Sequence, residues 1–108
     1  MTRLPPALAA AATDRILELL GEPPARVLEL GFAGIHATPL RLAGYEVVVV
    51  EPDPAHRARA QQRAGEVLDA VPDLAFDVVV APEGMQAPAT PRVIRVGQDG
   101  SVWSSASS

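Results

Sequence analysis

Two runs of valine constrain what this chain of 108 residues can fold into. One lies in residues 46–50 (EVVVV) and the other in residues 76–81 (FDVVVA). A strand that is apolar on both faces is typical of a parallel sheet, because both faces of such a sheet are covered. Parallel neighbours are joined by crossovers of a dozen or more residues, usually helices. The chain is therefore expected to be an α/β protein.

Apolar spacing and turn residues predict an alternation of helices and strands. The helices are expected at 5–20 and 35–43, the strands at 26–30, 46–50, 76–81 and 92–96, with a return strand at 101–103. Asp99-Gly100 predicts the turn of this C-terminal hairpin, and the serine-rich end is expected to fray. Right-handed crossovers then place strand 26–30 between the other two inner strands, with the hairpin outermost. Ligands of open α/β sheets bind where the strand order reverses, beyond the carboxyl ends of the strands.

Residues 54–71 allow two interpretations. Asp53 and Pro54 predict the start of a helix, and apolar spacing carries that helix to Val71, although Gly65 costs about 1 kcal/mol within it. Alternatively the helix ends at Gly65 and residues 66–68 form a strand. We favour the long helix. The strand would have to reach a distant neighbour through about six residues, which span at most about 20 Å.

A glycine turn and two acids form the candidate ligand site. Gly31 and Gly34 allow a sharp turn and the close approach of a ligand, and Glu51 follows the next strand, where an acid accepts hydrogen bonds from ribose hydroxyls. Glu29 lies within an apolar strand, and a buried carboxylate needs partners, which the turn amides can supply. The structural alternatives are ordinary turn glycines and, for Glu51, a solvated acid near the N-terminus of the next helix.

The two histidines are not expected to form a site. His36 is expected on the surface beside the turn, and His56 on a solvated helix face among arginines. Two histidines far apart, without cysteine, predict no metal site. Trp103 is expected to be a hairpin or interface residue.

Composition excludes several classes of function. The net charge of −4 argues against partners with a nucleic-acid backbone and against anionic membrane surfaces. No apolar run approaches the roughly 20 residues that span a bilayer, and the alanine-rich start does not resemble a signal peptide. The absence of cysteine excludes disulfides and thiolate chemistry and fits a cytoplasmic protein. The length predicts one small domain, residues 1–108.

Two segments together resemble a known family. The sequence VLELGFAG (27–34), followed by a helix and VVVVEPDP (47–54), is similar to motif I and the following acidic motif of class I S-adenosylmethionine-dependent methyltransferases. FDVVVAP (76–82) and the helix before the first strand match the same family, so the resemblance covers roughly residues 8–82. It implies a minimal three-layer, Rossmann-like (methyltransferase-like) parallel sheet with a C-terminal hairpin, and S-adenosylmethionine as cofactor.

The resemblance also implies roles for single residues. Gly31 and Gly34 would line the turn beneath the cofactor, and Glu29 would act near its methionine part through the turn or through water. Glu51 would hold the ribose hydroxyls, and Pro52 would border the adenine. If residues 66–68 form a strand, the acid that follows, Asp69, would match the one near the adenine amino group.

The chain departs from the family pattern at several points. Ala33 replaces the middle glycine, the turn is one residue short, and Phe32 is bulky where a small residue is common. The helices between the later strands and most of the substrate-binding region are missing or shrunken. Residues 81–83 (APE) replace the Asn- or Asp-Pro-Pro-aromatic motif of amino-group methyltransferases. No catalytic residue can therefore be assigned.

The expected function is that of an S-adenosylmethionine-binding, methyltransferase-like protein that transfers a methyl group to an acceptor not identified by the sequence. The question of enzyme activity stays open, with a preference for a methyltransferase. The alternative is a non-catalytic remnant of the fold that acts as an interaction or regulatory module, and a weaker one is a binder of another nucleotide. Few helices cover the valine strands, which predicts a homodimer with Trp103 and the hairpin near its interface and a second subunit that completes the site.

Overall fold

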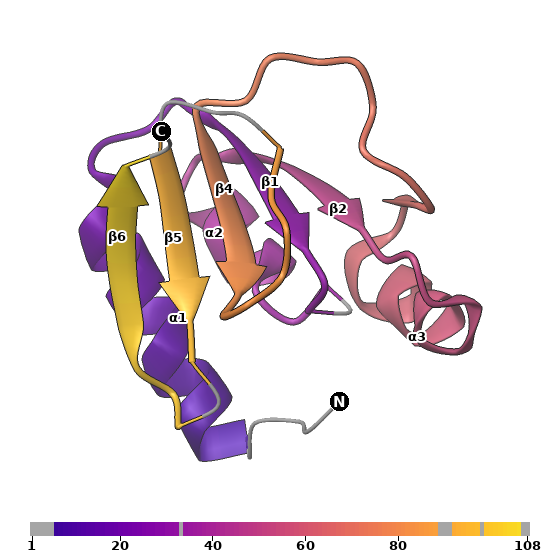
Figure 1. The fold of residues 1–108 in the computed structure, drawn as a ribbon, viewed down its shortest axis with the longest axis horizontal. Helices are drawn as coiled ribbons and strands as arrows, with labels where there is room; N and C mark the ends of the chain where they lie inside the picture. Colours follow the sequence, from indigo (N-terminus) through magenta and orange to yellow (C-terminus); the bar gives the residue numbers. More distant parts are fainter. Residues whose placement is uncertain (1–5, 33, 89–91, 98, 107–108) are drawn as a thin grey trace.

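The computed structural model describes residues 6–32, 34–88, 92–97 and 99–106 of the chain. The three helices in these ranges are α1 (Pro6–Leu20), α2 (Ala37–Leu42) and α3 (Pro54–Ala64) (Figure 1). The strands are β1 (Arg26–Leu30), β2 (Glu46–Val50), β3 (Val67–Leu68), β4 (Val78–Pro82), β5 (Arg92–Val96) and β6 (Val102–Ala106).

Within the described residues the strands form one sheet, in the order β3-β2-β1-β4-β5-β6. Neighbouring strands are parallel except β5 and β6, which form the hairpin. The predicted α/β class, the Rossmann-like parallel sheet and the central place of β1 are confirmed. The bounds predicted for β1, β2 and β5 also agree with the structure, because continuous apolar runs between turn residues define short buried strands well.

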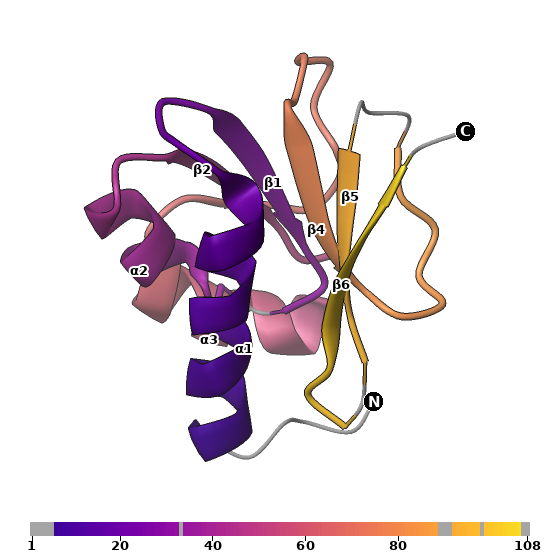
Figure 2. The same cartoon turned by 90° about the vertical axis from the view of Figure 1, so that its left-hand side faces the viewer.

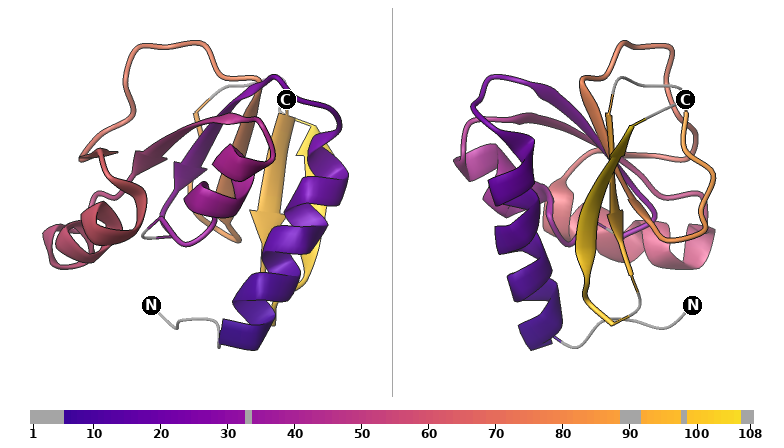
Figure 3. Two further views of the ribbon diagram at one scale, coloured as in Figure 1. Left: turned by 180° about the vertical axis from the view of Figure 1, so that it is seen from behind. Right: turned by 60° about the vertical axis from the view of Figure 1, so that its left-hand side comes forward.

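The helices pack on one face of the sheet. Figures 2 and 3 show α1 and α2 lying across it, and Ala60 of α3 belongs to the same core as residues of α1 and α2. Its fully buried side chains include Ile16, Val27, Leu40 and Ile94. Residues of this face therefore alternate along each strand with residues of the opposite face, as the pleat of a strand requires.

The opposite face is covered by connections between strands. Its buried cluster consists of Leu28, Leu30, Val50, Phe76, Val79 and Ala81. The loop after β4 lies on this side of the sheet, away from α1 and α2 (Figure 2), and Met85 and Ala87 of that loop pack against the cluster. A right-handed crossover from β4 to β5 runs in the opposite direction from that joining β1 to β2, so it must cover the other face. In the described part of the chain, loops therefore form the third layer, on the face where larger α/β proteins have helices.

The prediction of a long helix over residues 54–71 is wrong. The helix α3 ends at Ala64, with Gly65 as its C-cap, and Val67 and Leu68 pair with the end of β2. Chain reach does not exclude this strand, because residues 69–77 form the connection to β4, and nine residues can span about 30 Å. The crossing covers three strand spacings sideways, about 14 Å, and returns along the length of a five-residue strand, about 17 Å, so its straight path is about 22 Å, within that reach. No helix is needed for that crossing, which is drawn at the top of Figure 1.

Smaller corrections concern the ends of elements. The strand expected at 76–81 occupies Val78–Pro82, because Phe76 belongs to the connection and is buried against the sheet. The helix expected at 35–43 is shorter, at Ala37–Leu42. The return strand, expected at 101–103, occupies Val102–Ala106, and Ala106 pairs with Arg92. The fraying expected of the serine-rich end is therefore wrong for residues 104–106, and residues 107 and 108 lie outside the described residues. No helix in the described part of the chain is long and apolar enough to cross a membrane.

One arginine fastens α1 to the hairpin. The guanidinium of Arg92 donates hydrogen bonds to the carbonyl oxygens of Leu19 and Leu20 at the C-terminus of α1, and to Ser104 Oγ on β6. The last carbonyls of a helix have no partner within it, and a cation there also interacts favourably with the helix dipole. Arg92 is therefore expected to stabilise the packing of α1 on the sheet.

Replacing Arg92 by Met keeps an apolar stem and removes the charged donors. Hydrogen bonds from a charged group contribute about 1.5–3 kcal/mol, so we expect Arg92→Met to lower the free energy of unfolding by about that amount in urea denaturation. Arg15→Met is the matched control, because its pair with Glu18 is exposed and such pairs contribute about 0–1 kcal/mol. Equal losses in the two variants would contradict this role for Arg92.

Candidate functional site

The glycine turn lies between the carboxyl ends of β1 and β2. The backbone N–H of Gly31 donates to Val50 O at 3.2 Å, which holds the start of the turn beside the end of β2. Gly31 and Gly34 have φ angles of +82° and +75°, a region that other residues rarely adopt. Because β1 is flanked by β2 on one side and β4 on the other, the turn occupies the point at which the strand order reverses.

Glu29 holds this turn from inside the protein. Its side chain is fully buried, and its Oε1 accepts a hydrogen bond from the backbone N–H of His36 at 3.0 Å. A buried carboxylate needs such donors, and a turn amide supplies one, as the sequence suggested. The contact connects β1 with the beginning of α2. Any effect of Glu29 on a ligand would therefore pass through the position of the turn.

The expectation that His36 lies on the surface is wrong. Its side chain is fully buried, and its Nδ1 is hydrogen-bonded to Thr13 Oγ1 of α1 at 2.6 Å. The ring also contacts Phe32 edge to face, with 4.9 Å between the ring centroids. The available signal was Thr13, a polar residue three positions before the buried Ile16 on α1, since a polar group on that side of a helix needs a partner.

Burial controls the protonation of His36. Desolvation lowers the pKa of its imidazole from 6.5 to about 4, so the ring is neutral at neutral pH. Its Nε2 has no hydrogen-bond partner among the described residues. A neutral ring with one hydrogen-bonded nitrogen suits a structural contact between α1 and the turn.

Glu51 lies where the sequence placed an acid, directly after β2. Only 2 % of its surface is exposed, and its backbone is fixed by Leu68 O, which accepts from its N–H at 2.9 Å. Its Oε2 accepts from the backbone N–H of Asp53 at 3.2 Å. The guanidinium of Arg57 donates to the carbonyl oxygens of Glu51 and of the exposed Pro52, each at 3.0 Å. The acid is therefore held by the same turn that begins α3.

The short strand β3 gives Asp69 a defined place. Asp69 follows Leu68 and is exposed, so it lies just beyond the carboxyl end of β3. The carboxyl ends of β1, β2 and β3 lie side by side, so Gly31, Glu51 and Asp69 follow one another across the carboxyl-terminal end of the sheet. The resemblance matched Asp69 to the acid near the adenine amino group only if residues 66–68 form a strand. The structure has such a strand at Val67–Leu68.

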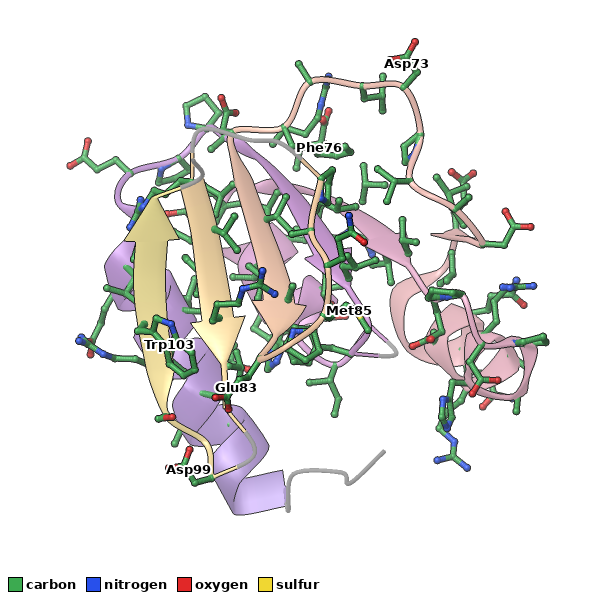
Figure 4. The ribbon with its side chains drawn as sticks, in the orientation of Figure 1. Asp73, Phe76, Glu83, Met85, Asp99 and Trp103 are labelled. Carbon is green, nitrogen blue, oxygen red and sulfur yellow. The ribbon has the colours of Figure 1, made fainter. Side chains whose placement is uncertain are left out.

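The space over Gly31 is taken by another side chain. A Cβ atom built on Gly31 would lie 2.7 Å from Met85 Cε and 2.8 Å from Met85 Sδ. Met85 belongs to the loop after β4, which passes in front of the sheet in Figure 4. Any group that approached Gly31 closely from this side would therefore have to displace the end of the Met85 side chain. An unbranched thioether side chain is well suited to such adjustment.

Within the described residues, no three His, Asp or Glu side chains gather in a way that could hold a metal ion.

The buried His36 predicts a pH-dependent stability. Its pKa is about 4 in the folded protein and about 6.5 when unfolded, so between these values the unfolded chain binds a proton that the folded chain does not. The free energy of unfolding should fall as the pH decreases from 6.5 to 4, by about 3 kcal/mol in total. His36→Gln removes this titration and should flatten the curve of stability against pH in that window.

Urea denaturation at several pH values measures the effect. His56→Gln is the matched control, because the half-exposed His56 ring lies beside Asp53 at the start of α3 rather than in the core, and the variant should keep the fall in stability between pH 6.5 and 4. Parallel curves for the wild type and His36→Gln would show that His36 is not buried as a neutral ring.

Comparisons with known proteins support the fold. No protein family and no curated protein sequence matches the chain. Among solved structures, it is similar to a TehB-like SAM-dependent methyltransferase from Corynebacterium glutamicum, with a TM-score of 0.59 and 21 % sequence identity. The similarity covers 82 % of this chain and 66 % of that protein, slightly less than two thirds of its length. The chain therefore has a Rossmann-like, methyltransferase-like fold.

Proposed function

We propose that this chain binds S-adenosylmethionine, or its product S-adenosylhomocysteine, at the carboxyl edge of β1, β2 and β3. The observation that carries the proposal is Glu51, a carboxylate almost fully buried directly after β2 and beside the Gly31 turn. A carboxylate in this position of a Rossmann-like sheet is suited to accept hydrogen bonds from ribose hydroxyls. The similar solved structure is described as a SAM-dependent methyltransferase, which favours this nucleoside over others.

The proposed roles follow the order of the strand ends. Glu51 holds the ribose, Pro52 borders the adenine, and Asp69 accepts a hydrogen bond from the adenine amino group. The backbone at Gly31 and Gly34 lies beneath the methionine part. Glu29 does not touch the ligand in this proposal and positions the turn through its hydrogen bond to His36 N.

Methyl transfer to an acceptor is the reaction that we propose for this site. When bound, the cofactor would supply a methyl group on its sulfonium: an acceptor would attack the methyl carbon in line, and S-adenosylhomocysteine would leave as the neutral thioether. Such a reaction depends mainly on the relative position of the two reactants. The chain's own contribution is to hold the nucleoside through Glu51 and the turn, and to place the loop after β4 next to Gly31, where Met85 reaches it.

Calorimetric titration with S-adenosylmethionine and S-adenosylhomocysteine tests the site. We expect micromolar binding by the wild type and a loss of at least about tenfold in Glu51→Gln, because a charged hydrogen-bond acceptor becomes neutral. Glu46→Gln is the matched control, since Glu46 is exposed at the opposite end of β2 and should leave the affinity unchanged.

Two results would contradict the proposal. One is the absence of binding at millimolar ligand by a folded wild-type protein. The other is equal affinity of the wild type and Glu51→Gln, which would place the ligand elsewhere.

A second candidate is a non-catalytic interaction or regulatory module built on the same fold. The contact of Met85 with Gly31 favours it, because it closes the part of the turn that a cofactor would approach. The same titration separates the two candidates, since a module of this kind stays folded and binds neither nucleoside at millimolar concentration.

We also propose that two copies of the chain associate along β6. In the described sheet β6 is an outer strand, its residues include no charged side chain and no proline, and Trp103 is exposed to 38 %. Such an edge is open to pairing with another strand. The partner is expected to be a second copy, because chains with a net charge of −4 repel one another least where they meet through a neutral strand.

Sedimentation velocity at micromolar concentration tests this association. The wild type is expected to sediment as a dimer, and Trp103→Lys, which puts two like charges at the shared edge, as a monomer. Leu42→Lys is the matched control, because Leu42 is strongly exposed at the end of α2 and away from β6. A wild type that remains monomeric, or a Trp103→Lys variant that remains dimeric, would contradict the proposed interface.

A further inference from the structure

The backbone of Met85 is fixed more firmly than its exposure suggests. The N–H of Met85 donates to Pro82 O at 3.2 Å, which closes a turn directly after β4. The guanidinium of Arg95, on the neighbouring strand β5, donates to Pro82 O at 3.0 Å and also to Met85 O. These bonds hold the Met85 backbone against β4 and β5, while its side chain extends across to β1.

The side chain of Met85 ends on Gly31. Only its two terminal heavy atoms, Sδ and Cε, approach the position of a Gly31 Cβ within 3 Å. The side chain also packs against the apolar cluster that includes Leu28, Leu30 and Phe76. Met85 is half-buried, and Figure 4 shows it in front of the sheet at the carboxyl ends of the strands. The contact therefore covers the part of the turn at which the proposed cofactor would approach the backbone.

We propose that Met85 is a movable plug of the ligand site, which covers Gly31 in the free protein and rotates away when S-adenosylmethionine or S-adenosylhomocysteine binds. This inference rests on the proposed function of the site. The motion needs no change of the backbone, because the contact is made by the last two atoms of a side chain with three rotatable bonds. Arg95 keeps the loop in place, so the plug returns to the same position when the ligand leaves.

The plug lowers the affinity of the site. A ligand that binds only the open form has an apparent dissociation constant equal to its intrinsic value divided by the open fraction. If the open form amounts to about 10 %, removal of the plug strengthens binding roughly tenfold. Met85→Ala is therefore expected to bind more tightly than the wild type, although it removes a side chain that a bound ligand could contact.

Nuclear magnetic resonance detects the plug without relying on activity. The chain contains two methionines, Met1 and Met85, so labelling methionine methyl groups with carbon-13 gives two signals, and Met85→Leu assigns them. In the free protein we expect a nuclear Overhauser effect between the Met85 methyl group and the Hα protons of Gly31. At saturating S-adenosylhomocysteine this effect should disappear. Its absence from the free protein, or its persistence in the complex, would overturn the proposal.

Calorimetric titration of Met85→Ala completes the test, with Gln86→Ala as the matched control. Gln86 is exposed in the same loop, so its loss should leave the affinity unchanged. Tighter binding by Met85→Ala alone supports the plug. Equal affinity of all three proteins would overturn the plug while leaving the ligand site intact, whereas no binding by any of them at millimolar ligand would overturn the proposed function. Thermal unfolding of each variant ensures that a folded protein is being compared.

Discussion

The hydrogen bond from the backbone N–H of His36 to Glu29 is the interaction on which the candidate site depends. A carboxylate in the middle of a buried strand is costly unless it accepts hydrogen bonds, so β1 can hold Glu29 only if the chain folds back over its end. The turn from Gly31 to His36 supplies that return. Because the His36 ring is also bonded to Thr13, the turn is fixed to α1 as well as to β1. The end of the turn is thus held by buried polar groups, whereas the glycines permit its path.

The handedness of the crossovers explains why the site has loops on one side and helices on the other. The connections from β1 to β2 and from β2 to β3 run in one direction and carry α2 and α3. The connection from β4 to β5 runs the other way and must cross the opposite face. It carries no described helix, so its apolar residues cover that face directly. Met85 reaches the turn because no helix separates this loop from the sheet.

The sequence predicted those features that depend on neighbouring residues. The strands β1 and β2, the N-cap at Asp53 and the position of Glu51 follow from apolar runs, turn residues and strand ends, all within a few positions of one another. The missed features depend on distant pairs. The buried His36 is hydrogen-bonded to Thr13 of a distant helix. The strand at 66–68 was the alternative not favoured, because two paired residues carry almost no periodic signal, and β3 forms where Val67 and Leu68 pair with the end of β2. The contact between Met85 and Gly31 joins a loop and a turn that no spacing rule connects.

Gly31 is required for two separate physical reasons. Its φ of +82° disfavours any residue with a Cβ, whatever surrounds it. The end of the Met85 side chain also occupies the position that a Cβ atom on Gly31 would take in this backbone conformation, so that side chain would have to shift. The first constraint belongs to the path of the turn, which the Glu29 hydrogen bond fixes, and it persists when a ligand is bound. The second belongs to a flexible side chain and ends once Met85 rotates away. A ligand that replaces Met85 would therefore meet a turn already shaped for close approach, so that rearrangement of one side chain, rather than of the fold, separates the closed site from the open one.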